Sequence, residues 1–283
     1  MIHDLHFSIS TGCFYQTPLA EVLHWFAKYN FTDLEICSFP PHLDFHDPEK
    51  VSEARQRIED CGLRALSFHA PFADQIDIAS WEESVRLRSV DELRRACDAA
   101  KELGTEFIVL HPGPEKERNL SPHEWYPKMQ LAATSLNEVA NHCRNIHLTL
   151  LLENMLPHLL FGNVADMLYL LGAIESSAVG TCLDTGHAFL SGDLSRVANK
   201  LSGHLRMIHA NDNCRKWDDH LPPGDGEIPW RPLLKQLSRE KFDGPLVLEL
   251  SGNGEPQEIL EGAKRGREFL QHLAAEERLV IDS

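Results

Sequence analysis

Short apolar runs alternate with longer segments of helical periodicity along the whole chain. The short runs are rich in aliphatic residues and predict β-strands at His6–Ser10, Asp33–Ile36, Ala65–His69, Phe107–His111, Leu148–Glu153, Val179–Asp184, Leu205–His209 and Leu246–Leu250. Between them, apolar residues recur with helical spacing and predict helices at Leu19–Tyr29, Pro48–Cys61, Val85–Leu103, Trp125–Cys143, Val164–Leu171, Leu194–Leu201, Trp230–Ser238 and Ile259–Leu273. Gly62 and Gly104 directly follow two of these helices, where a left-handed residue commonly ends a helix.

This alternation of strands and helices predicts parallel βαβ units and therefore an α/β fold, the (β/α)₈ TIM barrel. Apolar runs such as Phe107–Leu110 suit strands that are buried on both faces. An open doubly wound sheet is the structural alternative. It usually has fewer units and a glycine-rich phosphate turn, and neither a GxGxxG nor a P-loop pattern occurs here. Because no long linker interrupts the pattern, we expect one TIM-barrel domain over residues 1–283.

Charge and cysteine content make several classes of protein unlikely. The chain carries 27 Lys and Arg against 43 Asp and Glu, a formal charge of −16, which makes nucleic acid an unlikely partner. Its 7 cysteines form no CxxC pair, as expected for reduced thiols in a cytoplasmic protein. Residues 1–15 do not resemble a signal peptide, and no apolar run approaches the roughly 18 residues of a membrane helix, so we expect no membrane association.

Acidic and histidine residues stand at the ends of six consecutive predicted strands. They are His69, His111, Glu153, Asp184, His209 and Glu249, with His187 following shortly after Asp184. The carboxyl ends of barrel strands meet at one face, where the active sites of these enzymes form. We therefore expect these side chains to gather at the mouth of the barrel.

Such a cluster predicts a metal site. Carboxylates packed together repel one another, and a desolvated carboxylate tends to take up a proton. A divalent cation removes both costs, and mixed imidazole and carboxylate ligands favour Zn, Mn, Fe or Co over Ca or Mg. One histidine at a strand end is more often a hydrogen-bonded structural residue, but such residues on six strands indicate a metal centre.

The strand-end residues, together with the segment Asp218–Trp230 (DDHLPPGDGEIPW), resemble the xylose-isomerase-like TIM barrel superfamily over nearly the whole chain. That group includes sugar and sugar-phosphate isomerases and epimerases, the abasic-site endonucleases of AP endonuclease family 2, and inosose dehydratases. The sugar enzymes often carry a loop of the DxHxxxGxGxxxW type after strand seven. The resemblance implies a metal-dependent enzyme, most often one of carbohydrate metabolism.

The resemblance implies two patterns of metal binding. In the isomerases and epimerases one ion is held by acids on strands five, six and eight and by a histidine on strand seven. The matching residues here are Glu153, Asp184, Glu249 and His209. In the endonucleases three zinc ions use these four and further ligands, for which the matches are His69, His111, His187, Asp218 and His220. Both patterns are complete, so one ion is expected and up to three are possible.

Two loops favour a small substrate over DNA. The endonucleases insert aromatic and polar side chains into DNA from the loops after strands two and three. Here Cys37–His42 and His69–Phe72 contain no Arg, Gln or Tyr for such contacts. Together with the acidic charge, this favours a sugar or polyol. The loops Ser38–Asp47, Ala70–Ser80 and Asn154–Gly162 are the expected specificity loops.

We therefore predict a divalent-metal-dependent isomerase or epimerase that removes a proton next to a carbonyl of a small sugar, sugar phosphate or polyol. Glu153 and Glu249 are the expected acid–base pair, while Asp184 and His209 chiefly hold the metal. The alternatives are a multinuclear zinc phosphoester hydrolase, an inosose-type dehydratase and a non-catalytic metal-binding barrel. Aromatic residues on the predicted outer helices would permit a homo-oligomer.

Overall fold

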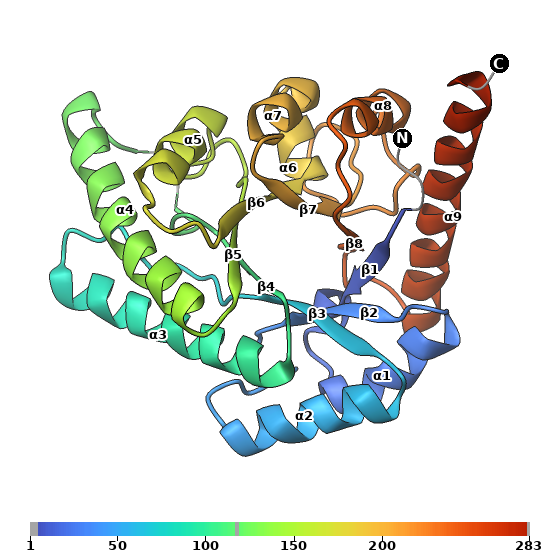
Figure 1. Cartoon of the computed structure of the whole chain (residues 1–283), viewed down its shortest axis with the longest axis horizontal. Helices are drawn as coiled ribbons and strands as arrows, with labels where there is room; N and C mark the ends of the chain where they lie inside the picture. Colours follow the sequence, from blue (N-terminus) through green and yellow to red (C-terminus); the bar gives the residue numbers. More distant parts are fainter. Residues whose placement is uncertain (1–4, 117–118, 282–283) are drawn as a thin grey trace.

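The computed structural model describes residues 5–116 and 119–281, and its centre is a closed barrel of eight parallel strands (Figure 1). The strands pair in sequence order, and β1 closes the barrel on β8. They are β1 Phe7–Ser10, β2 Asp33–Cys37, β3 Arg64–His69, β4 Phe107–Leu110, β5 Thr149–Glu153, β6 Val179–Asp184, β7 Leu205–Ala210 and β8 Leu246–Leu248. The predicted (β/α)₈ fold class is confirmed.

Helices surround the strands, from α1 in blue to α9 in red (Figure 1). They are α1 Leu19–Lys28, α2 Pro48–Asp60, α3 Glu83–Leu103, α4 Pro122–Asn145, α5 Val164–Ala173, α6 Thr185–Leu190, α7 Leu194–Leu201, α8 Trp230–Arg239 and α9 Pro256–Ile281. Each predicted helix is present, and the bounds agree within a few residues except at the end of α9, which continues to Ile281 and not Leu273. The 3₁₀ turn Thr11–Phe14 and the short α6 were not predicted, because neither is long enough to show helical periodicity. No helix in the described ranges has the length and apolar character needed to span a membrane.

The two faces of each strand explain where the polar residues lie. One face packs under the helices in the main core, through residues such as Ile108, Leu150 and Ile208. The other face points into the barrel and forms a separate small apolar cluster of Val109, Leu151, Cys182, Met207 and Val247. Because side chains alternate along a strand, the next inward positions are His111, Glu153, Asp184, His209 and Glu249. The apolar cluster is therefore the floor beneath the mouth.

The opposite end of the barrel carries its own ion pairs. The buried Asp33 at the start of β2 accepts hydrogen bonds from Arg64 Nε and from His6 Nε2, the latter at 2.8 Å. Burial acts to raise the pKa of Asp33, but these bonds hold it below its usual value. This end serves stability, as expected for the amino ends of barrel strands.

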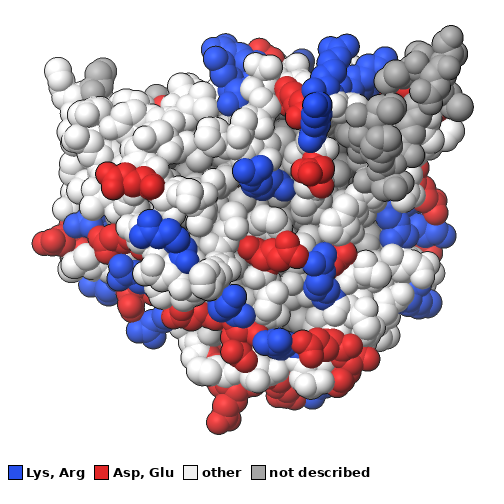
Figure 2. All heavy atoms as spheres, viewed as in Figure 1, with Lys and Arg blue, Asp and Glu red and all other residues white. Residues whose placement is uncertain are grey.

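Charged side chains are mixed over the surface. On the face shown in Figure 2, basic side chains lie among acidic ones and do not gather in one broad area. That distribution gives no sign, on this face, of the extended basic surface that nucleic acid requires.

Candidate active site

The structure brings all nine of the predicted mouth residues together. His69, Glu153 and Asp184 end β3, β5 and β6, and His209 lies near the end of β7. His111 and Glu249 are the first residues after β4 and β8. The sequence analysis placed both inside the corresponding strands. His187 stands on α6, and Asp218 and His220 lie on the loop between β7 and α8. Their roles as ligands or catalysts stay predictions.

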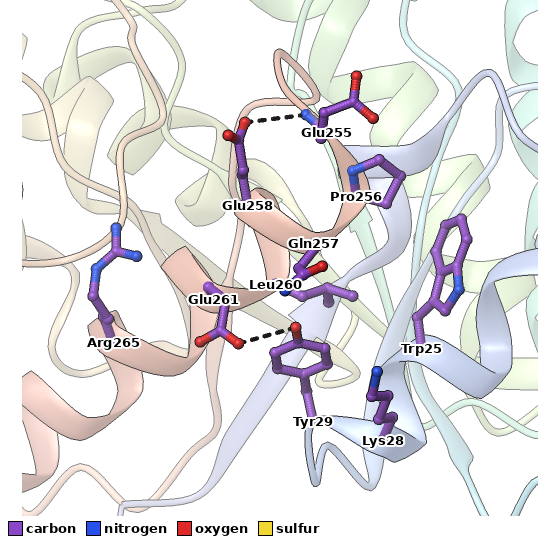
Figure 3. Close-up of a pocket in the computed structure, with 10 residues that line it drawn as sticks. All are labelled: Trp25, Lys28, Tyr29, Glu255, Pro256, Gln257, Glu258, Leu260, Glu261 and Arg265. Atoms are coloured by element: carbon purple, nitrogen blue, oxygen red, sulfur yellow. Dashed lines mark hydrogen bonds between the residues drawn. The ribbon is translucent and has the colours of Figure 1, made fainter.

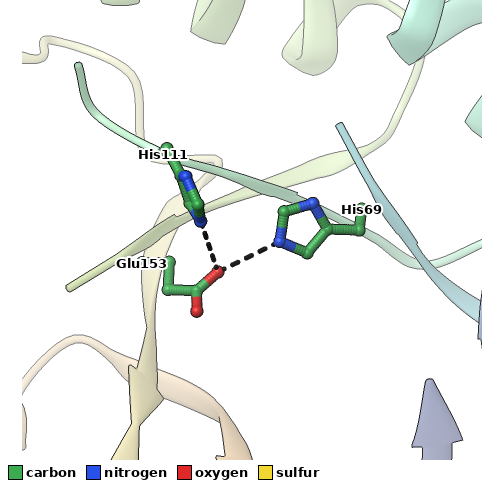
Figure 4. A group of neighbouring side chains, drawn as sticks. All are labelled: His69, His111 and Glu153. Atoms are coloured by element: carbon green, nitrogen blue, oxygen red, sulfur yellow. Dashed lines mark hydrogen bonds and ion pairs between the residues drawn. The ribbon is translucent and has the colours of Figure 1, made fainter. Parts of the chain in front are cut away.

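These residues form three groups that could each hold an ion, and a fourth set, His69, His209 and Glu249, whose members all belong to the first two groups. The potential ligand atoms of each group lie within 4.8 Å of one another: Glu153, Asp184, His209 and Glu249 form the central group, His69, His111 and Glu153 a second, and His187, Asp218 and His220 a third. Figure 4 shows the second group, in which both histidine rings point at one carboxylate oxygen. His69 Nε2 and His111 Nε2 lie 3.2 and 3.4 Å from Glu153 Oε2.

The central group has the spacing that a metal ion needs. His209 Nδ1 lies 3.1 Å from Glu153 Oε1 and 3.1 Å from Glu249 Oε2. Ligand atoms about 2.1 Å from one ion, at angles of about 90 to 110°, stand about 3.0 to 3.4 Å apart. The residues present therefore fit a divalent ion.

The third group contains an unused oxygen. Asp218 Oδ2 lies 3.2 Å from both His187 Nε2 and His220 Nε2. Asp218 Oδ1 is buried and has no hydrogen-bond partner among the described residues. A buried carboxylate oxygen without a partner is costly, and a cation would satisfy it. This group too is compatible with an ion.

Acidic neighbours raise the pKa values of the histidines at the mouth. Burial alone would lower the pKa of His111, but its contacts with Glu115 and Glu153 raise it to about 9. Burial also opposes the charge on His220, yet the contact with Asp218 and the other nearby carboxylates raise its pKa to about 10. In the absence of a bound cation, protons supply the positive charge that these carboxylates need.

We predict that removing metal makes stability depend on pH in a defined direction. A histidine with a raised folded-state pKa stabilises the fold fully below its unfolded value, near 6.5, and loses that contribution as pH rises through the folded value. Chelator-treated protein should therefore lose on the order of 3 kcal/mol of unfolding free energy between pH 6.5 and 10 through His111 alone. Burial raises the pKa of Asp184 to about 6, against the charge of His187, so this group gives a loss of the same sign at lower pH, between about pH 4 and 6.

Urea unfolding at several pH values, with EDTA or with one equivalent of Mn²⁺, measures this effect. Metal binding requires deprotonated ligands, so the stabilisation by Mn²⁺ should grow over the same pH range. His111→Gln should flatten the slope of the chelated protein. His272→Gln, at an exposed histidine of α9, is the control and should not change it. Equal slopes in all three chelated proteins would contradict the prediction.

Two asparagines that were not singled out from the sequence orient Asp184. Asn211 Nδ2 donates to Asp184 Oδ2 at 2.6 Å, and Asn154 bonds both the backbone N–H and the carbonyl of Asp184. Gly186 permits this approach, because a Cβ there would lie 2.1 Å from Asn211 Oδ1. The carboxylate is thereby held in place at the start of α6, where it also accepts the His187 N–H.

A buried aspartate organises the loop that carries Asp218 and His220. Asp212 accepts hydrogen bonds from the backbone N–H groups of Asn213, Gly224 and Ile228 and from Trp230 Nε1, at 2.8 to 3.0 Å. These contacts give a structural role to Gly224–Trp230 (GDGEIPW), the second half of the segment Asp218–Trp230. They hold the loop, and with it the third group, over the mouth.

Glu35 is the buried acid that the sequence analysis missed. It lies on β2 and is fully buried, and its Oε2 contacts Ser67 Oγ and His209 Nε2. The signal was present in the sequence as an acid inside the apolar run Asp33–Ile36. Because Glu35 stands in the middle of its strand, the pattern of residues at strand ends does not include it.

Two cavities that share lining residues lie beside the cluster. An inner cavity of about 170 Å³ is lined by members of all three groups together with Glu115, Met155, Leu156 and Leu159. An outer cavity of about 590 Å³ is lined by parts of the predicted specificity loops, including Phe39, Phe45, Pro71 and Phe72, and by Tyr15. Glu249 lines both cavities. A separate hollow of about 820 Å³ lies outside the barrel between α1 and α9 and contains none of the nine residues (Figure 3).

Comparison with known proteins shows the family to which the chain belongs. The family model of the xylose isomerase-like TIM barrel matches residues 23–273. "Uncharacterized protein MJ1311" of Methanocaldococcus jannaschii is 28% identical, over 98% of this chain and 94% of that protein. "Fructoselysine 3-epimerase" of Escherichia coli O157:H7 is 26% identical over 60% of this chain and 61% of its own length. "Probable endonuclease 4" of Mycobacterium ulcerans is 25% identical over 75% and 85%.

The fold is also that of solved structures. A D-tagatose 3-epimerase-like protein superposes with a TM-score of 0.82 at 24% identity, over 96% of this chain and 99% of that one. The match of the family model to most of the chain, and the closed barrel with its polar mouth, lead to one conclusion. The chain belongs to the xylose isomerase-like TIM barrel family.

Proposed function

We propose that this protein is a divalent-metal-dependent isomerase or epimerase of a small sugar or polyol. The observation that carries the proposal is the central group of Glu153, Asp184, His209 and Glu249, whose ligand atoms lie within 4.8 Å of one another and whose Glu249 lines a cavity large enough for such a ligand. The relatives named as sugar epimerases support the reaction class.

The lining of the outer cavity favours an uncharged substrate over a sugar phosphate. Tyr15, Phe39 and Phe72 form apolar walls suited to the C–H faces of a sugar ring. Among the described residues that line the two cavities there is no Lys or Arg to bind a phosphate, whereas Glu92 and Glu249 are present. A free sugar or polyol is therefore the proposed substrate.

The two glutamates expected to share proton transfer have different surroundings. The Glu249 side chain is 19% exposed and faces both cavities, whereas Glu153 is 1% exposed and has nitrogens of three histidines within 3.4 Å. Glu249 is therefore placed to take the proton from the carbon next to the substrate carbonyl, and Glu153 chiefly to hold the ion. When bound, a divalent ion would polarise that carbonyl and lower the pKa of the adjacent C–H.

Exchange of substrate hydrogen with solvent tests the proposal directly. Protein loaded with Mn²⁺ is incubated in D₂O with a panel of unphosphorylated ketoses and the matching phosphates, and deuterium at carbon is measured by NMR. We expect exchange into at least one free ketose, loss of exchange on chelation, and about one ion per chain by elemental analysis. Exchange that persists at full rate without metal would contradict the proposal, as would exchange confined to phosphorylated sugars. Loss of water after exchange would identify a dehydratase.

A second candidate, a multinuclear phosphoester hydrolase, is favoured by the two additional ligand groups. His69 and His111 with Glu153, and His187 with Asp218 and His220, offer places for two further ions beside the first. Adjacent ions can activate water and stabilise the charge that develops on a phosphate. Two or three zinc ions per chain, together with metal-dependent hydrolysis of bis(4-nitrophenyl) phosphate and no deuterium exchange, would favour this function instead.

A further inference from the structure

Glu35 is a buried carboxylate that points into the barrel. It stands on β2, and its Oε2 lies 3.2 Å from His209 Nε2 on β7, a strand that is not adjacent to β2. A contact between strands so far apart in the barrel requires both side chains to lie in its interior. Both side chains are fully buried.

The burial of the Glu35 carboxylate in the barrel interior requires a physical explanation. Apolar side chains fill neighbouring inward positions, and burying a carboxylate among them costs free energy unless it is well paired. Glu35 has two contacts on one oxygen, from Ser67 Oγ at 2.9 Å and from His209 Nε2. Its other oxygen, Oε1, is buried and has no hydrogen-bond partner among the described residues. Two contacts do not fully satisfy the group, so packing and stability alone do not account for it.

The contact between Glu35 and His209 Nε2 determines which ring nitrogen of His209 is available to bind a metal ion. If Nε2–H donates to Glu35, the other nitrogen, Nδ1, presents its lone pair. Nδ1 is the atom that lies 3.1 Å from Glu153 Oε1 and from Glu249 Oε2. Its lone pair is therefore directed at two carboxylate oxygens, an arrangement that calls for a cation between them.

We infer that Glu35 is a positioning residue for His209, which holds the ring in the tautomer and orientation that offer Nδ1 to the ion of the central group. The inference rests on the proposed metal site and adds a residue beyond the potential ligands. Carboxylates in this position fix the histidine and strengthen its bond to the metal, and their loss typically weakens binding by about 10- to 100-fold.

Metal affinity of two variants tests the inference without any assay of activity. Competition between the metal-free protein and a chromophoric chelator gives the Kd for Zn²⁺. Glu35→Leu removes the acceptor at similar volume and should weaken Zn²⁺ binding by about 10- to 100-fold. Glu35→Gln keeps an acceptor oxygen but not its charge, so the loss should be smaller. The matched control is Asp33→Asn, a buried acid of the same strand that contacts Arg64 and His6 at the other end of the barrel.

The outcomes separate positioning from a structural role. If Glu35 has only a structural role, all three variants should lower the free energy of unfolding while the Kd for Zn²⁺ stays within about twofold of that of the parent chain. That result overturns the inference. If Glu35→Leu does not fold, ¹⁵N NMR of histidine-labelled parent protein with Zn²⁺ decides, with His209→Gln for assignment. A proton on Nε2 supports the inference, and a proton on Nδ1 overturns it. A parent chain that binds no Zn²⁺ contradicts the proposed metal site itself.

Discussion

Glu249→Gln is expected to reduce deuterium exchange into the substrate by about 10³-fold while the protein stays folded and keeps its metal, since general-base catalysis typically contributes 10²- to 10⁴-fold. Gln is nearly isosteric and still offers an oxygen to an ion, but it cannot accept a proton from carbon. Because Glu249 lines both cavities and belongs to the central group, its loss should lower kcat far more than it raises KM.

The experiment needs a control that removes an acid of the same region. Glu255→Gln changes an exposed glutamate of the segment that follows β8 and should leave exchange within about twofold, as surface substitutions usually do. Metal content and thermal unfolding of both variants are measured alongside. Full exchange by Glu249→Gln, with its ion in place, would remove Glu249 from proton transfer and direct attention to Glu153.

The sequence was sufficient to predict the fold and the gathering of the candidate residues at the barrel mouth. Aliphatic runs such as Phe107–Leu110 alternate regularly with helical segments, and this pattern leads to a parallel barrel. His69, Glu153 and Asp184 each terminate a strand, and the carboxyl ends of parallel strands meet at one mouth. Chain order alone therefore brings these side chains together.

The remaining parts of the site depend on contacts between distant segments. Glu35 reaches His209 across the barrel, and periodicity within β2 does not reveal that partner. Asp212 is similar, because its carboxylate collects backbone N–H groups from a loop whose path follows no regular pattern. Whether three neighbouring ligand groups hold one ion or three is a question of metal affinity, which a list of ligands does not answer.

Two conservative substitutions, Asp184→Asn and Asp218→Asn, should differ greatly in their effects if the protein is an isomerase or epimerase. They should have similar effects if it is a multinuclear hydrolase. Asp184→Asn alters the central group, in which the carboxylate is fully buried and fixed by Asn211. We expect the ion to be lost and exchange to fall by about 10³-fold. Both oxygens of Asp184 accept N–H groups, from the His187 backbone and from Asn211 Nδ2, so the N–H₂ of Asn would face a donor and displace the side chain from the ion that the chemistry requires. Asp218→Asn alters only the third group. If one ion serves an isomerase or epimerase, metal content should stay near one per chain and exchange within about tenfold of the parent chain.

Asp219→Asn is the matched control, since Asp219 is the sequence neighbour of Asp218 but belongs to none of the three ligand groups. Elemental analysis, exchange and phosphodiester hydrolysis are measured for all three variants. A multinuclear hydrolase predicts a different pattern: Asp218→Asn would then lose one ion of two or three and be as inactive in hydrolysis as Asp184→Asn. That result would contradict the isomerase or epimerase proposal, because a single-ion site for proton transfer has no need of the ligand group on the β7–α8 loop.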